Sequence, residues 1–204
     1  MHILSMIKNN TKNFSEPFII FLNLFNKAKK FDKLYYNAFA LATSDFNGNV
    51  SVRMLLLKGI NPTGFIFFTN YNSLKGKQLF INPFGEILFF WKELKYQIRI
   101  HGKIEKLSNN LSDIYFNSRP RGSKISTWVS QQSNFINDRK HLLKIYQQYK
   151  VKFKYKKVPR PEYWGGYILI PESFEFWKER KNRLHERILF RFENNIWNKY
   201  YLAP

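Results

Sequence analysis

The sequence predicts a mainly β (α+β) fold, an antiparallel barrel with helices packed outside it. Aromatic residues make up 19% of the 204-residue chain, with 21 Phe and 12 Tyr, and aromatic side chains favour strands. Short stretches of alternating apolar and polar residues follow one another between turn-forming segments, as antiparallel strands do. One helical insert separates a first group of strands from a closing group, which favours a single barrel over repeated βα units.

The first predicted element is a helix at 16–31, because Pro17 suits a first helical turn and apolar residues recur at helical spacing. Three strands follow, at 38–45, 50–58 and 64–70, and the turn FNGN joins the first two. The segment 73–82 predicts a short helix that ends before Pro83.

The second half continues with strands at 85–93 and 96–107. Alternation in the latter places three polar side chains on one face, namely Gln97, Arg99 and His101. Residues 108–150 are mostly helical with a break at SRPRGS, and three or four strands fill 165–204. We find no internal repeat and no long linker. We therefore expect one domain over 1–204, with 1–15 a flexible N-terminal segment.

Composition limits the function classes. The chain has no cysteine, which excludes disulfides and thiolate catalysis, and with only four histidines we expect no metal site. The absence of cysteine is typical of a reducing compartment, and we expect a cytoplasmic protein without a secretory signal. The longest apolar run, FIIFL, is too short to span a membrane.

The net charge of +20 has two interpretations. Such a charge is typical of proteins that bind nucleic acid or an anionic membrane. Alternatively, the abundance of Asn, Ile, Phe and Lys beside scarce Ala and Gly indicates a compositional skew that spreads lysine over the surface. Charge alone does not decide between them.

Residue types that bind phosphate gather at the ends of predicted strands and helices. Arginine supplies forked contacts, lysine a point charge, and serine and threonine hydroxyl donors. Each residue taken singly also has an ordinary interpretation, as a solvated strand residue, a helix cap, a surface lysine or a core aromatic. The set comprises Arg53, Lys58, Thr69, Ser73, Lys75, Tyr115, Arg119, Arg121, Ser123, Gln132 and Ser133.

The stretch KNRLHER at 181–187 is a second cationic cluster. As a strand it would place Arg183, His185 and Arg187 on one face, where they would repel one another unless an anion lay between them. As a helix it would pair Arg183 with Arg187 and turn His185 elsewhere. The neighbouring segments FEFWKE and ILFRF alternate as strands do, so we predict a strand.

The order of several segments resembles the pyridoxine (pyridoxamine) 5′-phosphate oxidase family from about residue 17 to 204. The segments are RMLLLK, FFTN with SLKGKQ, YQIRIHGKIEKLS, YFNSRPRGSKISTWVSQQS, EYWGGY, FEFWKE with NRLHER, and the terminal LAP. The resemblance implies an antiparallel FMN-binding split β-barrel and a homodimer with FMN at the subunit interface. It also implies oxidation of pyridoxine or pyridoxamine 5′-phosphate to pyridoxal 5′-phosphate, with O2 as electron acceptor and H2O2 as product.

The resemblance further assigns site residues. It implies substrate contacts from Lys58, Tyr115, Arg119, Ser123, Arg183, Leu184 and His185, of which Arg183 and His185 would orient the substrate as catalytic residues. It implies cofactor contacts from Arg53, Met54, Leu55, Leu56, Leu57, Lys58, Phe68, Thr69, Lys75, Gln97, Gln132, Ser133, Trp177 and Arg187.

The sequence departs from the family pattern in four places. Leu74 stands where the family usually has an arginine, Phe68 where a tyrosine is common, and Asn117 where a histidine is frequent. The N-terminal segment that covers the substrate in relatives is not visible before Phe14.

Two other functions remain as alternatives. One is a split-barrel flavoprotein with another substrate or without activity, against which the complete set of substrate-side residues argues. The other is a nucleic-acid-binding protein, but the sequence shows no aromatic RNA-binding signature. We therefore expect no nucleic acid and no membrane as partner.

Overall fold

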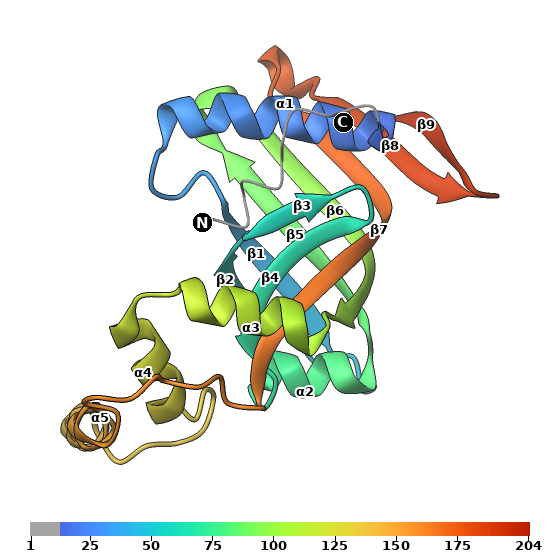
Figure 1. Ribbon diagram of the computed structural model, residues 1–204. Helices are drawn as coiled ribbons and strands as arrows, with labels where there is room; N and C mark the ends of the chain where they lie inside the picture. Colours follow the sequence, from blue (N-terminus) through green and yellow to red (C-terminus); the bar gives the residue numbers. More distant parts are fainter. Residues whose placement is uncertain (1–12) are drawn as a thin grey trace.

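A computed structural model describes residues 13–204 (Figure 1). Its helices are α1 (Glu16–Phe31), α2 (Leu74–Ile81), α3 (Asn109–Ser118), α4 (Arg121–Val129) and α5 (Arg139–Lys152). Its strands are β1 (Ala38–Ser44), β2 (Val50–Leu56), β3 (Gly59–Asn61), β4 (Gly64–Asn70), β5 (Phe84–Trp91), β6 (Tyr96–Lys106), β7 (Trp164–Lys178), β8 (Glu186–Glu193) and β9 (Ile196–Leu202). The flexible segment expected at 1–15 falls mostly outside the described residues.

The strands of residues 13–204 form one curled antiparallel sheet in the order β2-β1-β5-β6-β7-β4-β3. The long strand β7 has two neighbours on the same edge: its first part pairs with β4 and its second part with β8. The register between β6 and β7 shifts between His101 and Gly102, where the strands bend. Gly102 is required there, because a Cβ atom would lie 2.0 Å from the carbonyl oxygen of Ile170.

The two ends of this sheet meet where the chain leaves β2. The amide of Leu57 donates to the carbonyl of Asn37 beside β1, and the next amide, of Lys58, donates to the carbonyl of Ile66 in β4, both at 2.8 Å. The single strand predicted at 50–58 therefore ends at Leu56, and a short strand β3 follows it. This change of partner holds Lys58 at the junction between two parts of the sheet.

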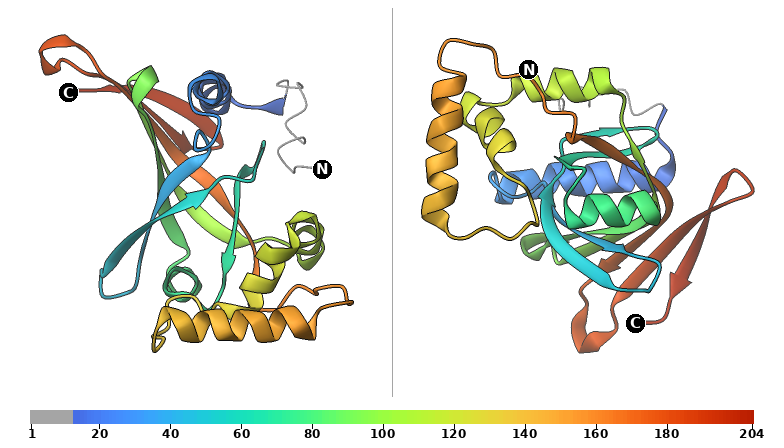
Figure 2. Two further views of the ribbon diagram at one scale, coloured as in Figure 1. Left: turned by 90° about the vertical axis from the view of Figure 1, so that its left-hand side faces the viewer. Right: turned by 90° about the horizontal axis from the view of Figure 1, so that it is seen from below.

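Helices cover the ends and one side of the sheet. Helix α1 crosses one end, where Phe18 and Phe21 pack against Phe65 of β4, while α2 lies at the other end (Figures 1 and 2). Helices α3 to α5 form a separate layer around a second apolar cluster that includes Phe116 and Trp164. The hairpin of β8 and β9 extends away from this layer (Figure 2).

Apart from the end of β2 and the short strand β3, which the sequence patterns do not predict, the predicted elements are confirmed except at the segment 181–187. The strand predicted there is wrong, because Lys181–Arg183 form a 3-10 turn that links β7 to β8. Asn182 and Arg183 are both left-handed, with φ of 57° and 61°, and two such residues break the alternation of a strand. Arg183, His185 and Arg187 therefore do not lie along one strand face, and only Arg187 belongs to β8.

Candidate functional site

A pocket of about 730 Å³ opens between β2, the end of β4 and the helices α3 and α4. Its lining residues are Met54, Leu55, Leu56, Lys58, Phe68, Thr69, Asn70, Tyr115, Arg119, Pro120, Ser123, Ser126, Thr127, Ser130, Gln132 and Trp164. Predicted site residues that are far apart in the sequence thus meet in one cavity. The lining contains two cations and no carboxylate.

One pair of cations, Arg53 and Lys75, lies directly beside the lining residues. The guanidinium of Arg53 donates through Nη1 to the carbonyl of Leu41 at 3.0 Å and to Oγ1 of Thr43 at 2.7 Å, and through Nη2 to Oγ of Ser51. Burial lowers the pKa of Arg53 from its ordinary value. Burial, and secondly the charge of Arg53, lowers the pKa of Lys75 to about 8.

The start of α2 fixes Lys75 against the loop that follows α4. Ser73 caps the helix by accepting from the amide of Gly76, which packs so closely that a Cβ atom would lie 2.0 Å from the carbonyl oxygen of Tyr71. The ammonium of Lys75 donates to Oε1 of Gln132 at 2.9 Å, and Oγ1 of Thr69 donates to the same oxygen at 3.2 Å. Three predicted cofactor residues from separate elements are therefore joined.

A second pair of cations, Lys58 and Arg119, lines the pocket itself. Burial, and secondly the charge of Arg119, lowers the pKa of Lys58, and burial lowers that of Arg119. Nη1 of Arg119 donates to Oγ1 of Thr127 at 2.7 Å, and its guanidinium lies 4.6 Å from the ring centroid of Trp164. A hydroxyl and an aromatic face thus orient this guanidinium while leaving its charge uncompensated.

An aromatic wall lies beside this second pair. The rings of Phe68 and Tyr115 stack with centroids 3.9 Å apart, and the ring of Trp164 is 5.6 Å from that of Phe68. Phe68, which stands where the family often has tyrosine, therefore contributes its ring to packing. Burial raises the pKa of Tyr115, which keeps its hydroxyl protonated as a hydrogen-bond donor.

None of these four cations forms an ion pair within residues 13–204. Two pairs of like charges, each partly or fully buried, are costly unless a bound anion neutralises them. The electrostatics of the pocket therefore match a ligand, or two ligands, with two strongly anionic groups.

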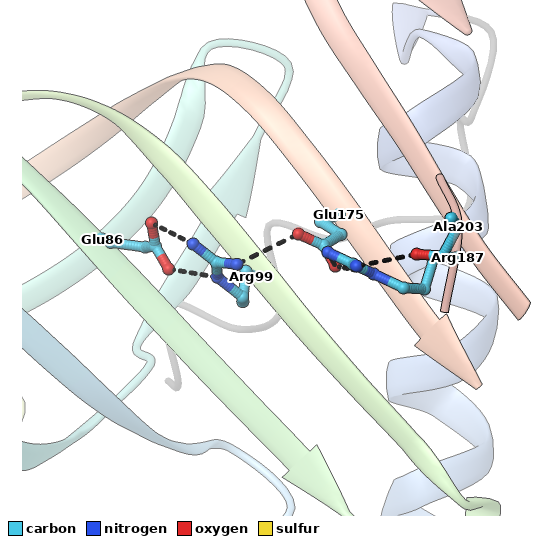
Figure 3. Close-up of polar contacts among 5 residues, drawn as sticks. All are labelled: Glu86, Arg99, Glu175, Arg187 and Ala203. Atoms are coloured by element: carbon cyan, nitrogen blue, oxygen red, sulfur yellow. Dashed lines mark hydrogen bonds and ion pairs between the residues drawn. The ribbon is translucent and has the colours of Figure 1, made fainter. Parts of the chain in front are cut away.

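A second group of predicted residues lies elsewhere, on the sheet face away from the core. Gln97 of β6 is opposite Trp177 of β7, which is opposite Arg187 of β8. Arg187 contacts Glu175 through its Nη2 at 2.8 Å and donates to the carbonyl of Ala203 at 2.9 Å (Figure 3). Glu175 also accepts from Arg99, which in turn pairs with Glu86 (Figure 3).

The turn after β7 presents the remaining predicted residues. Arg183 and Leu184 are exposed, whereas His185 is half-buried with its ring 4.5 Å from that of Trp177. The amide of Arg180 donates to Nδ1 of His185 at 3.2 Å, which leaves Nε2 to carry the proton of the neutral ring. The left-handed conformation of Arg183 is a strained one of the kind found at functional sites.

The two groups are far apart within one chain. Gly166 pairs with Phe68 of the pocket wall, and Trp177 lies about eleven residues further along β7, or roughly 35 Å at the usual rise per residue. Gln97, Trp177 and Arg187 are not among the residues that line the pocket. One chain therefore brings together the pocket residues, but it does not bring the second group to them. This second group is called the Trp177 group below and comprises Gln97, Trp177, Arg183, Leu184, His185 and Arg187.

The remaining predicted residues and departures are placed as follows. Leu57 is buried in the core below the junction, and Ser133 has a left-handed backbone in the exposed loop after α4. Arg121 is held by the carbonyl oxygens of Phe153 and Lys156, away from the pocket. Leu74 and Asn117 are exposed.

Sequence reasoning missed the neutral residues that hold the pocket cations, namely Thr43, Ser51, Gln78, Thr127 and Trp164. Their residue types do not indicate this role in the sequence, because the role depends on contacts between separate helices and strands. Among residues 13–204, no helix is long and apolar enough to cross a membrane, and no cluster of three His, Cys, Asp or Glu side chains is arranged to hold a metal.

Comparison with known proteins places this geometry in a family. Residues 27–151 match the family model described as pyridoxamine 5′-phosphate oxidase, which includes most of the pocket. Residues 164–204 match the model described as the pyridoxine 5′-phosphate oxidase C-terminal dimerisation region, which contains the Trp177 group except Gln97.

Whole-chain relatives carry the same name. Pyridoxine/pyridoxamine 5′-phosphate oxidase of Pelagibacter ubique is 46% identical over 93% of this chain and 92% of the relative. The protein of that name from Pseudomonas putida is 44% identical over 93% of this chain and 89% of the relative.

Solved structures agree on the fold. PhzG from Burkholderia lata, in complex with tetrahydrophenazine-1-carboxylic acid, has a TM-score of 0.85 and 29% identity, covering 93% of each chain. An FMN-binding protein of Nostoc punctiforme has a TM-score of 0.75 and 16% identity over 94% of this chain and all of the other. The predicted split-barrel fold is thus confirmed, and the chain belongs to the pyridoxine/pyridoxamine 5′-phosphate oxidase family.

Proposed function

We propose that the chain is an FMN-dependent oxidase that converts pyridoxine or pyridoxamine 5′-phosphate to pyridoxal 5′-phosphate. With the alcohol substrate, one O2 is reduced to one H2O2 as the CH2OH group becomes the aldehyde. With the amine, one water is also consumed and ammonia is released. We propose that it acts as a single-domain protein in the cytoplasm. The lack of cysteine supports a reducing compartment.

The observation that carries this proposal is the presence of two cation pairs that have no carboxylate partner among residues 13–204. FMN and the substrate each bear one phosphate, so the proposed reaction brings two dianionic groups to one pocket. Arg53 with Lys75, and Lys58 with Arg119, supply one pair for each. A pocket for a single phosphorylated ligand would leave one pair unneutralised.

We assign Arg53 and Lys75 to the FMN phosphate, with Thr69, Gln132 and Ser133 as hydroxyl and amide partners. Among residues 13–204, strand β2 pairs with β1 on one side and lies at the end of the sheet, so the backbone groups of residues 54–56 that face away from β1 are available to the polar rim of a flavin ring. The fit rests on these donors and on the absence of a competing carboxylate. When bound, FMN supplies the redox chemistry by accepting a hydride from C4′ of the substrate.

We assign the substrate phosphate to Lys58 and Arg119, with Tyr115 and Ser123 as hydroxyl donors. Because the side chain of Arg119 is fixed by Thr127 and Trp164 before any ligand arrives, little reorganisation is needed on binding. The phosphate would be held at the side of the pocket formed by α3 and α4, with the pyridine ring extending toward β2.

We propose that a second protomer completes the site. The Trp177 group lies too far along β7 to reach the pocket of its own chain, and all of it except Gln97 falls in the segment that matches the family's dimerisation region. In a two-fold dimer built through this region, the turn of one protomer would face the pocket of the other. Gln97, Trp177 and Arg187 would then contact FMN across the interface.

Arg183, Leu184 and His185 would reach the substrate from that partner turn. The charge of Arg183 and the Nε2 proton of His185 would orient the pyridine ring and balance charge as the hydride leaves. We assign neither residue as an obligatory base. Within the chain Arg183 makes no ion pair in residues 13–204, so its charge is available to a ligand.

An oxidase acting on a tricyclic carboxylic acid is the second candidate, because the PhzG structure is similar in fold. A carboxylic acid carries one negative charge and needs no dedicated pair of buried cations. Lys58 with Arg119 therefore favours the phosphorylated substrate, as does the higher identity to the oxidases.

The test begins with the purified protein and its absorption spectrum. We expect a yellow protein with a flavin spectrum, or a colourless one that becomes yellow with added FMN. Pyridoxine 5′-phosphate and pyridoxamine 5′-phosphate, each added under air, should yield pyridoxal 5′-phosphate and H2O2, whereas pyridoxine without phosphate should react poorly. A protein that binds no FMN contradicts the proposal, and a flavoprotein that forms no pyridoxal 5′-phosphate contradicts its substrate.

A further inference from the structure

Gln78 lies behind Arg53 and is not among the residues assigned above to FMN or to the substrate. Its side chain is buried, with 4% exposed. Its amide oxygen accepts from Oγ1 of Thr43 and from Oγ of Ser51, both at 2.6 Å. Its amide nitrogen donates to the carbonyl of Asn49 at 3.1 Å.

The same two hydroxyls accept from Arg53. Nη1 of Arg53 donates to Oγ1 of Thr43, and Nη2 donates to Oγ of Ser51. The network forms a closed ring, in which the two ends of one guanidinium reach a single amide oxygen through two hydroxyls. Both hydroxyls thereby use their one proton toward Gln78 and their lone pairs toward Arg53.

The orientation of the amide follows from this connectivity. A guanidinium has only donors, so each hydroxyl must accept from it and donate onward. The atom of Gln78 that faces both hydroxyls must then be the oxygen. The other amide atom faces a backbone carbonyl, which only accepts, and it must be the nitrogen.

We infer that Gln78 is a positioning residue, a neutral acceptor that holds Arg53 in place while leaving its positive charge to the cofactor phosphate. This inference rests on the proposed function. Carboxylates hold the arginines of the outer sheet face, as Glu175 holds Arg187, and there the charge is neutralised within the chain. At Gln78 an isosteric carboxylate would keep the two hydrogen bonds from the hydroxyls, lose the one donated to the carbonyl of Asn49, and cancel the charge.

The substitution Gln78→Glu keeps the oxygen that orients Arg53 through the two hydroxyls but adds a negative charge behind it. Comparing FMN with riboflavin isolates the contribution of the phosphate to binding. Riboflavin has the same ring and ribityl chain without the phosphate. We expect Gln78→Glu to weaken FMN binding by roughly ten- to a hundredfold and to leave riboflavin binding unchanged. The measurement is a fluorescence titration of each flavin with the cofactor-free protein.

A second variant removes the network without burying a new charge. The double substitution Thr43→Val with Ser51→Ala deletes both hydroxyls, and we expect a smaller loss, about tenfold, again confined to FMN. Thermal unfolding of each variant reports whether it is folded. If Gln78→Glu does not fold, the double variant alone decides the inference.

The outcomes distinguish this inference from the proposed function. If the unaltered protein binds neither flavin, both fail. If it prefers FMN over riboflavin and both variants keep that preference, the proposed cofactor stands and the role of Gln78 is overturned. Equal weakening of both flavins would also overturn it, because that result indicates a structural role for Gln78 and not an effect on the phosphate.

Discussion

Arg53, beside the pocket, and Arg99, on the outer sheet face, have similar neighbours in the sequence but opposite electrostatic surroundings. Arg53 lies on β2 and Arg99 on β6, each between apolar neighbours on a strand. Arg99 binds Glu86 and Glu175 (Figure 3), and its hydrogen bond to Glu86 raises its pKa. Within the described part of the chain, Arg53 binds only hydroxyl and carbonyl oxygens, and burial lowers its pKa.

The difference shows that the number of cations does not identify a ligand site, whereas their partners do. A cation that pairs with carboxylates, as Arg99 does, has its charge neutralised within the chain. A buried cation held by neutral acceptors keeps its charge for a ligand. By this criterion the net charge of +20 is mostly uninformative. Two cations of the pocket lining, Lys58 and Arg119, and two directly beside it, Arg53 and Lys75, carry the functional signal.

The largest expected effect is that of Arg119→Ala. We expect catalytic efficiency with pyridoxine 5′-phosphate to fall on the order of a hundredfold, mainly through KM, because a forked charge-assisted contact to the phosphate is lost. FMN should remain bound. The matched control is Arg121→Ala, whose guanidinium binds backbone carbonyls away from the pocket. Loss of FMN with KM unchanged would contradict the assignment of Arg119.

Arg183→Ala should have the next largest effect. We expect turnover or substrate affinity to fall on the order of tenfold, since the group that orients the substrate is missing while FMN binding is kept. Lys181→Ala, in the same turn, is the control. If the Arg183 variant instead loses FMN and keeps its substrate affinity, Arg183 contacts the other ligand.

A smaller effect should appear in the pH dependence of FMN binding. The pKa of Lys75 in the free chain is about 8, so the ammonium is present below that pH and lost above it. Bound phosphate favours the protonated form, and affinity should therefore fall as pH rises, by about fivefold between pH 8 and 9. Titrations of the unaltered protein and of Lys75→Met test this. Identical slopes would show that Lys75 does not contact the phosphate.

The smallest effect should come from the outer sheet face. Glu86→Gln removes one of the two carboxylates around Arg99, in a pair that is partly exposed and screened by solvent. We expect the free energy of unfolding in urea to fall by about 0.5 kcal/mol, with the affinity for FMN unchanged. A change in the preference for FMN over riboflavin would remove the distinction between the two sets of arginines.

Much of the fold follows from local patterns in the sequence. The alternation of Gln97, Arg99 and His101 predicts the exposed face of β6 correctly, because one face of that strand packs on the core. Helix α1 follows from Pro17 and the spacing of its phenylalanines. The branching of β7 between two partners depends on the bend near Gly102, which no local pattern reveals.

The turn at 181–185 shows where such patterns fail. Both neighbouring strands alternate, and the segment between them has no glycine or proline to mark a turn. Its turn rests on Asn182 and Arg183 in left-handed conformations, which asparagine tolerates and arginine adopts only under tertiary constraint.

Residue types and the family resemblance predict which residues belong to the candidate site. They do not predict which of its cations lack a carboxylate partner. Arg53 and Arg99 look alike in sequence, and only the tertiary partners Thr43 and Glu86 distinguish them. The placement of Trp177 far from the pocket of its own chain likewise required the structure.

The central claim is that the cations of one chain and the turn of a second chain form one substrate site. Complementation tests it most directly. One chain carries Arg119→Ala, the other carries Arg183→Ala with His185→Ala, and the two are co-expressed in equal amounts. If each site uses two chains, every mixed dimer has one intact site, and we predict recovery of about a quarter of unaltered activity. Activity no higher than the average of the two separate variants would contradict the account, because it would place both groups on the same chain.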